Sequence, residues 1–147
     1  MARKTRTARP AGLRTADFMR LASFRLALRR FLHFSESAAV RVGLTGQQYQ
    51  AMLAVRGNPD GQAVTINDLA QRLMIRHNSA VGLVDRLVDQ KLMVREAMVD
   101  DRRKVRLQLT GKGEQLFARL ASVHRAELQK IGPVMYRALR EITDGTE

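Results

Sequence analysis

The 147-residue chain has no cysteine and no tryptophan, and aromatic residues make up only 5% of it. The lack of cysteine excludes disulfide bonds, thiolate nucleophiles and thiol redox sensors. The few aromatic rings leave little for stacking on single-stranded nucleic acid bases. No apolar run reaches the roughly 18 residues that predict a membrane span, and no apolar signal segment follows the N-terminus. We therefore expect a cytoplasmic protein with no membrane partner.

Acidic residues are scarce relative to basic ones. The chain has 26 Lys and Arg against 14 Asp and Glu, which gives a formal net charge of +12 and a sequence pI of about 11.4. Such an excess favours a polyanionic partner, with nucleic acid before an anionic membrane. The 45% hydrophobic content is that of a folded protein, and the length fits one domain.

Patterns that carry catalysis or metal binding are also missing. The three histidines His33, His77 and His124 are far apart and have no H-x-x-x-H or carboxylate-rich spacing, so no metal site is predicted. No nucleophile, base and oxyanion arrangement is recognisable. We expect a protein that is not an enzyme and has no cofactor, and we interpret the seven methionines as packing residues rather than oxidant sensors.

Residues 1–16 carry five basic residues and no acid, which predicts a flexible basic arm. Whether this arm is a solvated tail or contacts DNA stays open. From Asp17 to about Val42, a broad apolar helical pattern follows. Thr45 and Gln48 then form the pattern of a capping box, which predicts a helix from this point to about Arg56.

A second pair in capping spacing, Thr65 and Asp68, predicts a short helix that ends at Leu73. A break of three residues leads to another helix over roughly 77–90. The two helices and the break between them together predict a helix-turn-helix. At about 100° per residue, the second helix separates an apolar face from a polar face. Its polar N-terminal end has short side chains that can approach DNA base edges closely.

The next segment predicts a β-hairpin with a charged tip. Residues 92–98 form one strand, and the alternation in Val105–Leu109 indicates a second, half-buried strand. The basic tip suits the narrow, electronegative minor groove, and a merely solvated turn is the alternative. We expect Asp101 to accept a hydrogen bond from Arg103 and so fix the direction of the guanidinium group.

After the hairpin, Thr110 caps a long helix, and Gly132 with Pro133 predicts its end and the start of a last helix. Both ends of the chain then carry more apolar helical surface than one small domain can cover. We therefore expect a homodimer.

The stretch "INDLAQRLMIRHNSAVGLVDRLVDQKLMVREAMVDDRRKVRLQLTGKG", residues 66–113, resembles the DNA-binding core of the MarR family of bacterial transcriptional regulators. The segments "LVDRLVDQKLMVR" and "DRRKVRLQLTGKG" carry the resemblance, which extends roughly over residues 18–142. It implies a mainly α (α+β) fold in one domain, 17–147. In that domain, residues 17–44 and 111–147 form the dimerisation region, and residues 45–110 form a winged helix-turn-helix lobe.

The resemblance also implies the functional residues. Arg76 stands where the family commonly has a small cap, and Gly82 stands where a larger polar residue is common. His33 and Tyr49 are candidate ligand-binding residues in the cleft between dimerisation helices and lobe, with a core role as the alternative. Arg86 is expected either to contact a phosphate or to pair with a neighbouring aspartate. Together with the basic hairpin tip and the position before the second helix, the resemblance gives the predicted DNA-binding residues Arg76, His77, Asn78, Ser79, Gly82, Arg86, Asp101, Arg102, Arg103 and Lys104.

These features together predict a ligand-responsive repressor of nearby genes. As a homodimer it would bind double-stranded DNA at a near-palindromic operator and release it when a small molecule binds. The family's habits imply an aromatic acid or phenolic effector, and the positive charge also suits an acyl-CoA thioester. The alternative is a non-specific nucleoid-type nucleic-acid-binding protein, for which the high pI and the basic arm would suffice.

Overall fold

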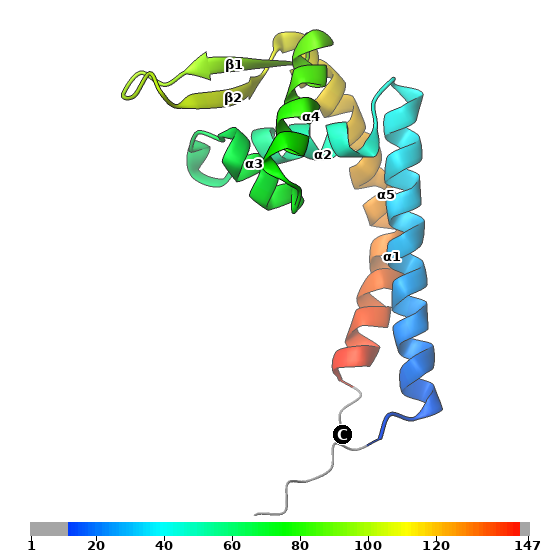
Figure 1. Ribbon diagram of the computed structural model, residues 1–147. Coiled ribbons are helices and arrows are strands. Elements are labelled where there is room, and N and C mark those ends of the chain that lie inside the picture. The colour runs from blue at the N-terminus through cyan, green and yellow to red at the C-terminus, as the bar shows by residue number, and fades with distance from the viewer. Residues whose placement is uncertain (1–11, 145–147) are drawn as a thin grey trace, which may run out of the picture.

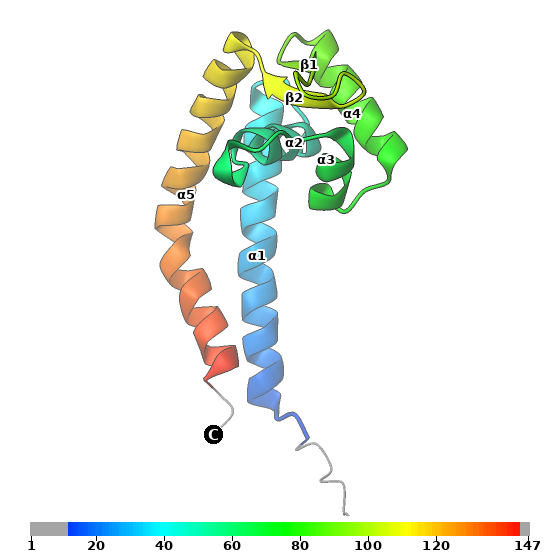
Figure 2. The ribbon, with the colours of Figure 1, turned by 90° about the vertical axis from the view of Figure 1, so that its left-hand side faces the viewer.

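The computed structural model describes residues 12–144 and has two parts, a long pair of helices and a lobe at one end of it (Figures 1 and 2). The fold is mainly helical with one two-stranded antiparallel sheet, as the sequence predicts. Residues 1–11 of the predicted arm lie outside the described residues, and the first helix begins at Thr15, two residues before its predicted start at Asp17. The elements are α1 (Thr15–Arg41), α2 (Gly46–Arg56), a short 3-10 helix η1 (Pro59–Gly61), α3 (Ile66–Leu73), α4 (His77–Asp89), β1 (Met93–Ala97), β2 (Val105–Leu109) and α5 (Gly111–Thr143).

The predicted caps of α2, α3 and α5 are confirmed. At α2, the backbone N–H of Gln48 donates to Thr45 Oγ1 at 3.1 Å, and the N–H of Thr45 donates to Gln48 Oε1 at 2.9 Å. The same reciprocal pair joins Thr65 and Asp68 at α3. At α5, Thr110 Oγ1 accepts from the backbone N–H of the third helical residue. Each cap satisfies N–H groups that a helix start leaves without a partner.

The predicted break at Pro133 is wrong, because α5 continues through it to Thr143. Proline removes one backbone donor and crowds the carbonyl four residues earlier, that of Gln129. Both Gln129 and Pro133 are exposed, so water can hydrate the carbonyl that loses its partner. The helix is bowed along its length but unbroken (Figure 2). Among residues 12–144, no helix combines the length and apolar character that crossing a bilayer requires.

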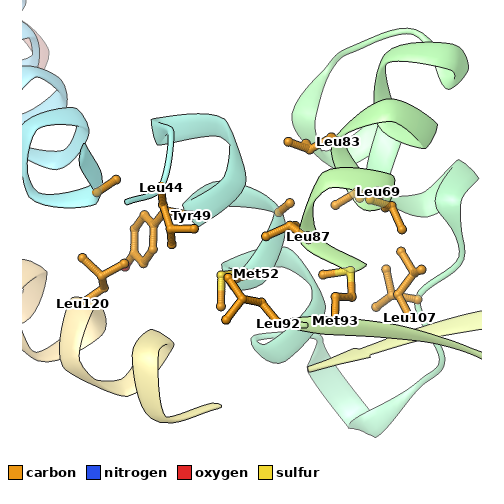
Figure 3. Close-up of a cluster of buried hydrophobic side chains, with 14 of the residues drawn as sticks. Leu44, Tyr49, Met52, Leu69, Leu83, Leu87, Leu92, Met93, Leu107 and Leu120 are labelled. Carbon is orange, nitrogen blue, oxygen red and sulfur yellow. The ribbon is translucent and has the colours of Figure 1, made fainter. Parts of the chain in front are cut away.

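One continuous core runs through the lobe and on to the helix pair (Figure 3). In the lobe, Met52, Leu69, Leu87 and Met93 are fully buried at the junction of α2, α3, α4 and β1. The partner strand β2 contributes Leu107 to the same core. Because α2, α3, α4 and both strands supply parts of one core, the sheet is held at a fixed position relative to α3 and α4.

A buried polar pair joins α1 to α5 where the helix pair meets the lobe. Nε2 of His124 lies 2.7 Å from Ser35 Oγ, and its Nδ1 lies 2.7 Å from the carbonyl oxygen of Leu120. The ring of Tyr49, from α2, stacks on His124 with centroids 4.2 Å apart and on Phe117 at 6.0 Å. His124 is therefore a packed residue.

Candidate nucleic-acid interface

The helices α3 and α4 form the predicted helix-turn-helix, joined by the turn 74–76. Met74 adopts the left-handed conformation with φ of 53°, which ends α3 and redirects the chain. The N–H of Ile75 donates to the carbonyl of Ala70 at 3.0 Å and closes the turn. The four buried residues of α4 are Ala80, Leu83, Val84 and Leu87, which is the apolar face that the periodicity predicts.

The opposite face of α4 is open to solvent. Asn78, Ser79 and Arg86 are exposed, and Gly82 is partly exposed with no atom within 4 Å of where a Cβ would lie. Within residues 12–144, the side chains of Asn78 and Ser79 make no hydrogen bond. The part of this face around Asn78, Ser79 and Gly82 is therefore unobstructed.

The N-terminus of α4 has no side-chain cap. Its N-cap is Arg76, which has an extended backbone and makes no capping hydrogen bond, and the first turn contains no acidic residue. Asn78 and Ser79 lie inside the helix and do not cap it. Among the described residues, no side chain caps the free N–H groups at the positive end of the helix dipole, which is a suitable arrangement for a phosphate.

The strands β1 and β2 form the predicted hairpin, and the segment 98–104 forms its tip. The N–H of Met98 donates to the carbonyl of Lys104, and the N–H of Lys104 donates to the carbonyl of Asp101, both at 2.9 Å. Asp101 Oδ1 accepts from the backbone N–H of Arg103 at 3.0 Å. Asp101 thus stabilises the turn itself, as an aspartate two residues before an N–H commonly does. The expected bond to the Arg103 guanidinium is not formed.

Ion pairs fix the hairpin in place. Arg95 on β1 pairs with Asp85 on α4, and Arg106 on β2 pairs with Glu96 across the sheet at 2.8 Å. Asp85 is therefore engaged by the hairpin rather than by Arg86. In the part of the chain that the structure describes, the exposed side chains of Arg86, Arg102, Arg103 and Lys104 form no ion pair. These four cations are available to an outside anion.

A groove of about 610 Å³ lies between α3, the start of α4 and the hairpin. His77 lines it from the first position of α4, and Arg103 and Lys104 line it from the hairpin. The groove therefore brings together predicted site residues that are about 25 positions apart in the sequence. The other lining residues are Ala63, Thr65, Ile66, Asn67, Asp68, Met98 and Val105.

Asn67 is a residue of this groove that the sequence did not indicate. Its Oδ1 lies 2.7 Å from Nδ1 of His77. The sequence gives no signal for this contact, because the pair is ten residues apart on different helices. Beside it, the backbone N–H of Thr65 is the main cause that lowers the pKa of Asp68, and it keeps that carboxylate ionised.

The two candidate ligand residues have different surroundings. Tyr49 is buried at 3% exposure, stacked on His124, and burial raises the pKa of its hydroxyl. This is the core role given as the alternative. His33 is exposed on α1.

Comparison with known proteins agrees with this description. Residues 42–104 match the model of the MarR family. A mutant of S. aureus MepR bound to an oligodeoxyribonucleotide has 17% identity and a TM-score of 0.66, and covers 92% of this chain and 100% of its own. AbsC, a MarR family transcriptional regulator from Streptomyces coelicolor, has 21% identity and a TM-score of 0.68, with coverages of 82% and 81%. The MarR repressor from Listeria monocytogenes has 24% identity and a TM-score of 0.60, with coverages of 92% and 85%. No curated protein sequence gives a match. At these identities, the solved structures show the fold.

Proposed function

We propose that this chain, whose winged helix-turn-helix segment belongs to the MarR family, regulates transcription by binding duplex DNA. The observation that carries the proposal is the groove between α4 and the hairpin, with His77 on one side and Arg103 and Lys104 on the other. The open face of α4 has the size and polarity of a helix that enters a major groove. The basic hairpin tip then reaches the adjacent minor groove.

The phosphate backbone separates the two grooves of a duplex. If α4 enters the major groove and the hairpin tip enters the minor groove, one backbone strand must pass between them. The groove provides this passage, and the uncapped start of α4 and the two hairpin cations supply positive charge along it. Arg86, further along α4, is placed for another phosphate contact.

We propose a homodimer formed through α1 and α5. Large apolar side chains remain exposed on both helices, with Phe18 at 57%, Met19 at 66% and Tyr136 at 66%. We infer that a second copy of the chain covers this apolar surface, as in a symmetric dimer. The dimer would place two α4 helices on one operator, about one DNA turn apart, which is why we expect the operator to be near-palindromic.

Binding to the DNA upstream of the chain's own gene, compared with random duplex at the same near-physiological salt, tests the proposal. We expect an affinity ratio of about 10³ or more. We expect Arg103→Ala to reduce operator affinity about tenfold or more. Arg119→Ala removes an exposed arginine from α5 and is the matched control that should leave affinity unchanged.

A ratio near one would contradict regulation of specific genes and favour the non-specific nucleoid-type protein. If both arginine substitutions have equally small effects on affinity, the hairpin is not part of the DNA interface.

We further propose that the protein is a repressor released by an anionic effector, an aromatic acid or its CoA thioester. Arg25, Arg29 and His33 are exposed at successive four-residue steps on one face of α1, which gives an anion a cationic surface. Tyr49, which packs from α2 against α5, would transmit effector binding to the lobe through that contact. Calorimetry with aromatic acids and their CoA thioesters, with DNA release as the readout, tests this. If Arg25→Ala and Arg29→Ala leave effector binding unchanged, the proposed effector site on α1 is wrong.

A further inference from the structure

The contact between Asn67 and His77 fixes which nitrogen of the histidine carries its hydrogen. Oδ1 of Asn67 is an acceptor, and Nδ1 of His77 lies 2.7 Å from it, so Nδ1 must be the donor. In the neutral ring, Nε2 then carries no hydrogen and can only accept. A phosphate oxygen is also only an acceptor. A neutral His77 held in this way therefore cannot donate a hydrogen bond to DNA.

The charges around His77 come from every element that borders the groove. Asp68 on α3 is anionic and is already bound by the N–H and Oγ1 of Thr65 at 2.9 and 3.0 Å. Arg103 and Lys104 face the groove from the hairpin, and Arg76 precedes His77 in the turn. Cations thus outnumber the single carboxylate among these groups. A phosphate in the groove would reverse this balance.

We propose that His77 takes up a proton when the DNA backbone enters the groove, and that Asn67 is the positioning residue that makes this possible. With its Nδ1 hydrogen held by Asn67, the protonated ring directs its Nε2 hydrogen to a phosphate oxygen. This inference rests on the proposed function and adds to it a link between DNA binding and pH. Histidine is the side chain that exchanges a proton in the neutral range.

Linkage sets the sign and the limit of the effect. Since the bound state holds more protons, affinity rises as pH falls, by at most about tenfold per pH unit for each proton taken up. Each protomer of a dimer contributes one His77. Across about two pH units around neutrality, we expect affinity to increase tenfold or more as the pH is lowered.

The test is the dissociation constant of the full-length chain, measured by fluorescence anisotropy from about pH 8 to pH 6 at constant ionic strength. The probe is a duplex that the protein itself selects from a random-sequence pool. We expect His77→Gln to abolish the rise in affinity, because glutamine does not titrate. Arg119→Gln, at an exposed residue of α5 that does not line the groove, is the control and should keep the rise.

Two substitutions separate positioning from folding. Asn67→Leu removes the acceptor and should flatten the pH profile. Asn67→Asp keeps an acceptor and adds a negative charge, so the rise should persist and move to higher pH. A loss of structure alone would not move the profile in this way, and thermal unfolding of each variant shows whether it is folded.

A pH profile that His77→Gln shares with the unsubstituted chain would overturn the inference, as would affinity that does not change with pH. Both outcomes leave the proposed DNA binding intact. If instead no duplex is bound at any pH, the proposed function itself fails.

Discussion

Gly113 lies in the first turn of α5, and adding a single methyl group there should strongly lower the stability of the fold. A Cβ there would lie 2.0 Å from the carbonyl oxygen of Leu92 and 3.0 Å from its carbonyl carbon. Both are backbone atoms just before β1, so no side-chain rotation can relieve the clash. Gly113→Ala must therefore push the start of α5 away from the hairpin.

The cost follows from what this displacement breaks. Overpacking alone costs about 1–3 kcal/mol. The displacement also strains the bond from the N–H of Thr110 to the Leu92 carbonyl at 3.1 Å, and a lost backbone hydrogen bond costs about 1 kcal/mol. We expect Gly113→Ala to lower the free energy of unfolding by about 2–4 kcal/mol.

Urea unfolding at fixed protein concentration measures this change. Gly132→Ala is the matched control in the same helix, because no atom lies within 4 Å of its added Cβ. It should raise stability by up to about 1 kcal/mol through helix propensity. If Gly113→Ala proves as stable as the control, the close approach of α5 to the hairpin is refuted.

Three further predictions concern other contacts. Asp68→Ala should cost about 1 kcal/mol of unfolding free energy at neutral pH. Because the folded-state pKa of Asp68 is lowered, its stabilisation is present above the unfolded-state pKa and is lost as pH falls through the folded-state pKa. The difference in urea unfolding should therefore shrink as the pH is lowered below the ordinary aspartate pKa of 3.8. His124→Leu should cost about 1–3 kcal/mol by leaving the Ser35 hydroxyl without its partner, and adding Ser35→Ala should recover part of that loss in urea unfolding. Arg95→Met, at a partly exposed ion pair, should change stability by less than about 1 kcal/mol but weaken DNA binding, because it frees the hairpin from α4. Strictly additive effects of Arg95→Met and Asp85→Asn on DNA affinity would argue against that coupling.

The sequence alone predicted those structural features that depend on residues close together in the chain. The caps at Thr45, Thr65 and Thr110 each need a partner within three residues, so spacing alone identifies them. The apolar face of α4 follows in the same way from its own periodicity. Pro133 shows the limit of such local rules, since packing against α1 holds α5 together through a residue that would end an isolated helix.

The sequence alone could not predict contacts between residues that are far apart in the chain. Nothing in the order of residues pairs Asn67 with His77 or Arg95 with Asp85, because each pair forms only when the core sets α3, α4 and the hairpin against one another. The role of Asp101 was missed for a different reason. A carboxylate near an arginine invites an ion pair, but the backbone N–H of the tight turn is closer and needs no side-chain ordering.

The net charge, which first pointed to a polyanionic partner, is not concentrated where the proposed interface lies. Residues 45–110 hold ten Lys and Arg against seven Asp and Glu, a net +3, whereas residues 1–44 hold ten against two, a net +8. Within the lobe, acids such as Asp85 and Asp101 hold the hairpin and its tip in place, while the cations at the groove stay unpaired among the described residues. The lobe thus uses its acids to position its bases. DNA binding by this lobe would therefore depend on where a few cations lie rather than on the net charge of the chain. A phosphate contact requires a cation within hydrogen-bond distance. The attraction due to net charge is weakened by the salt in solution.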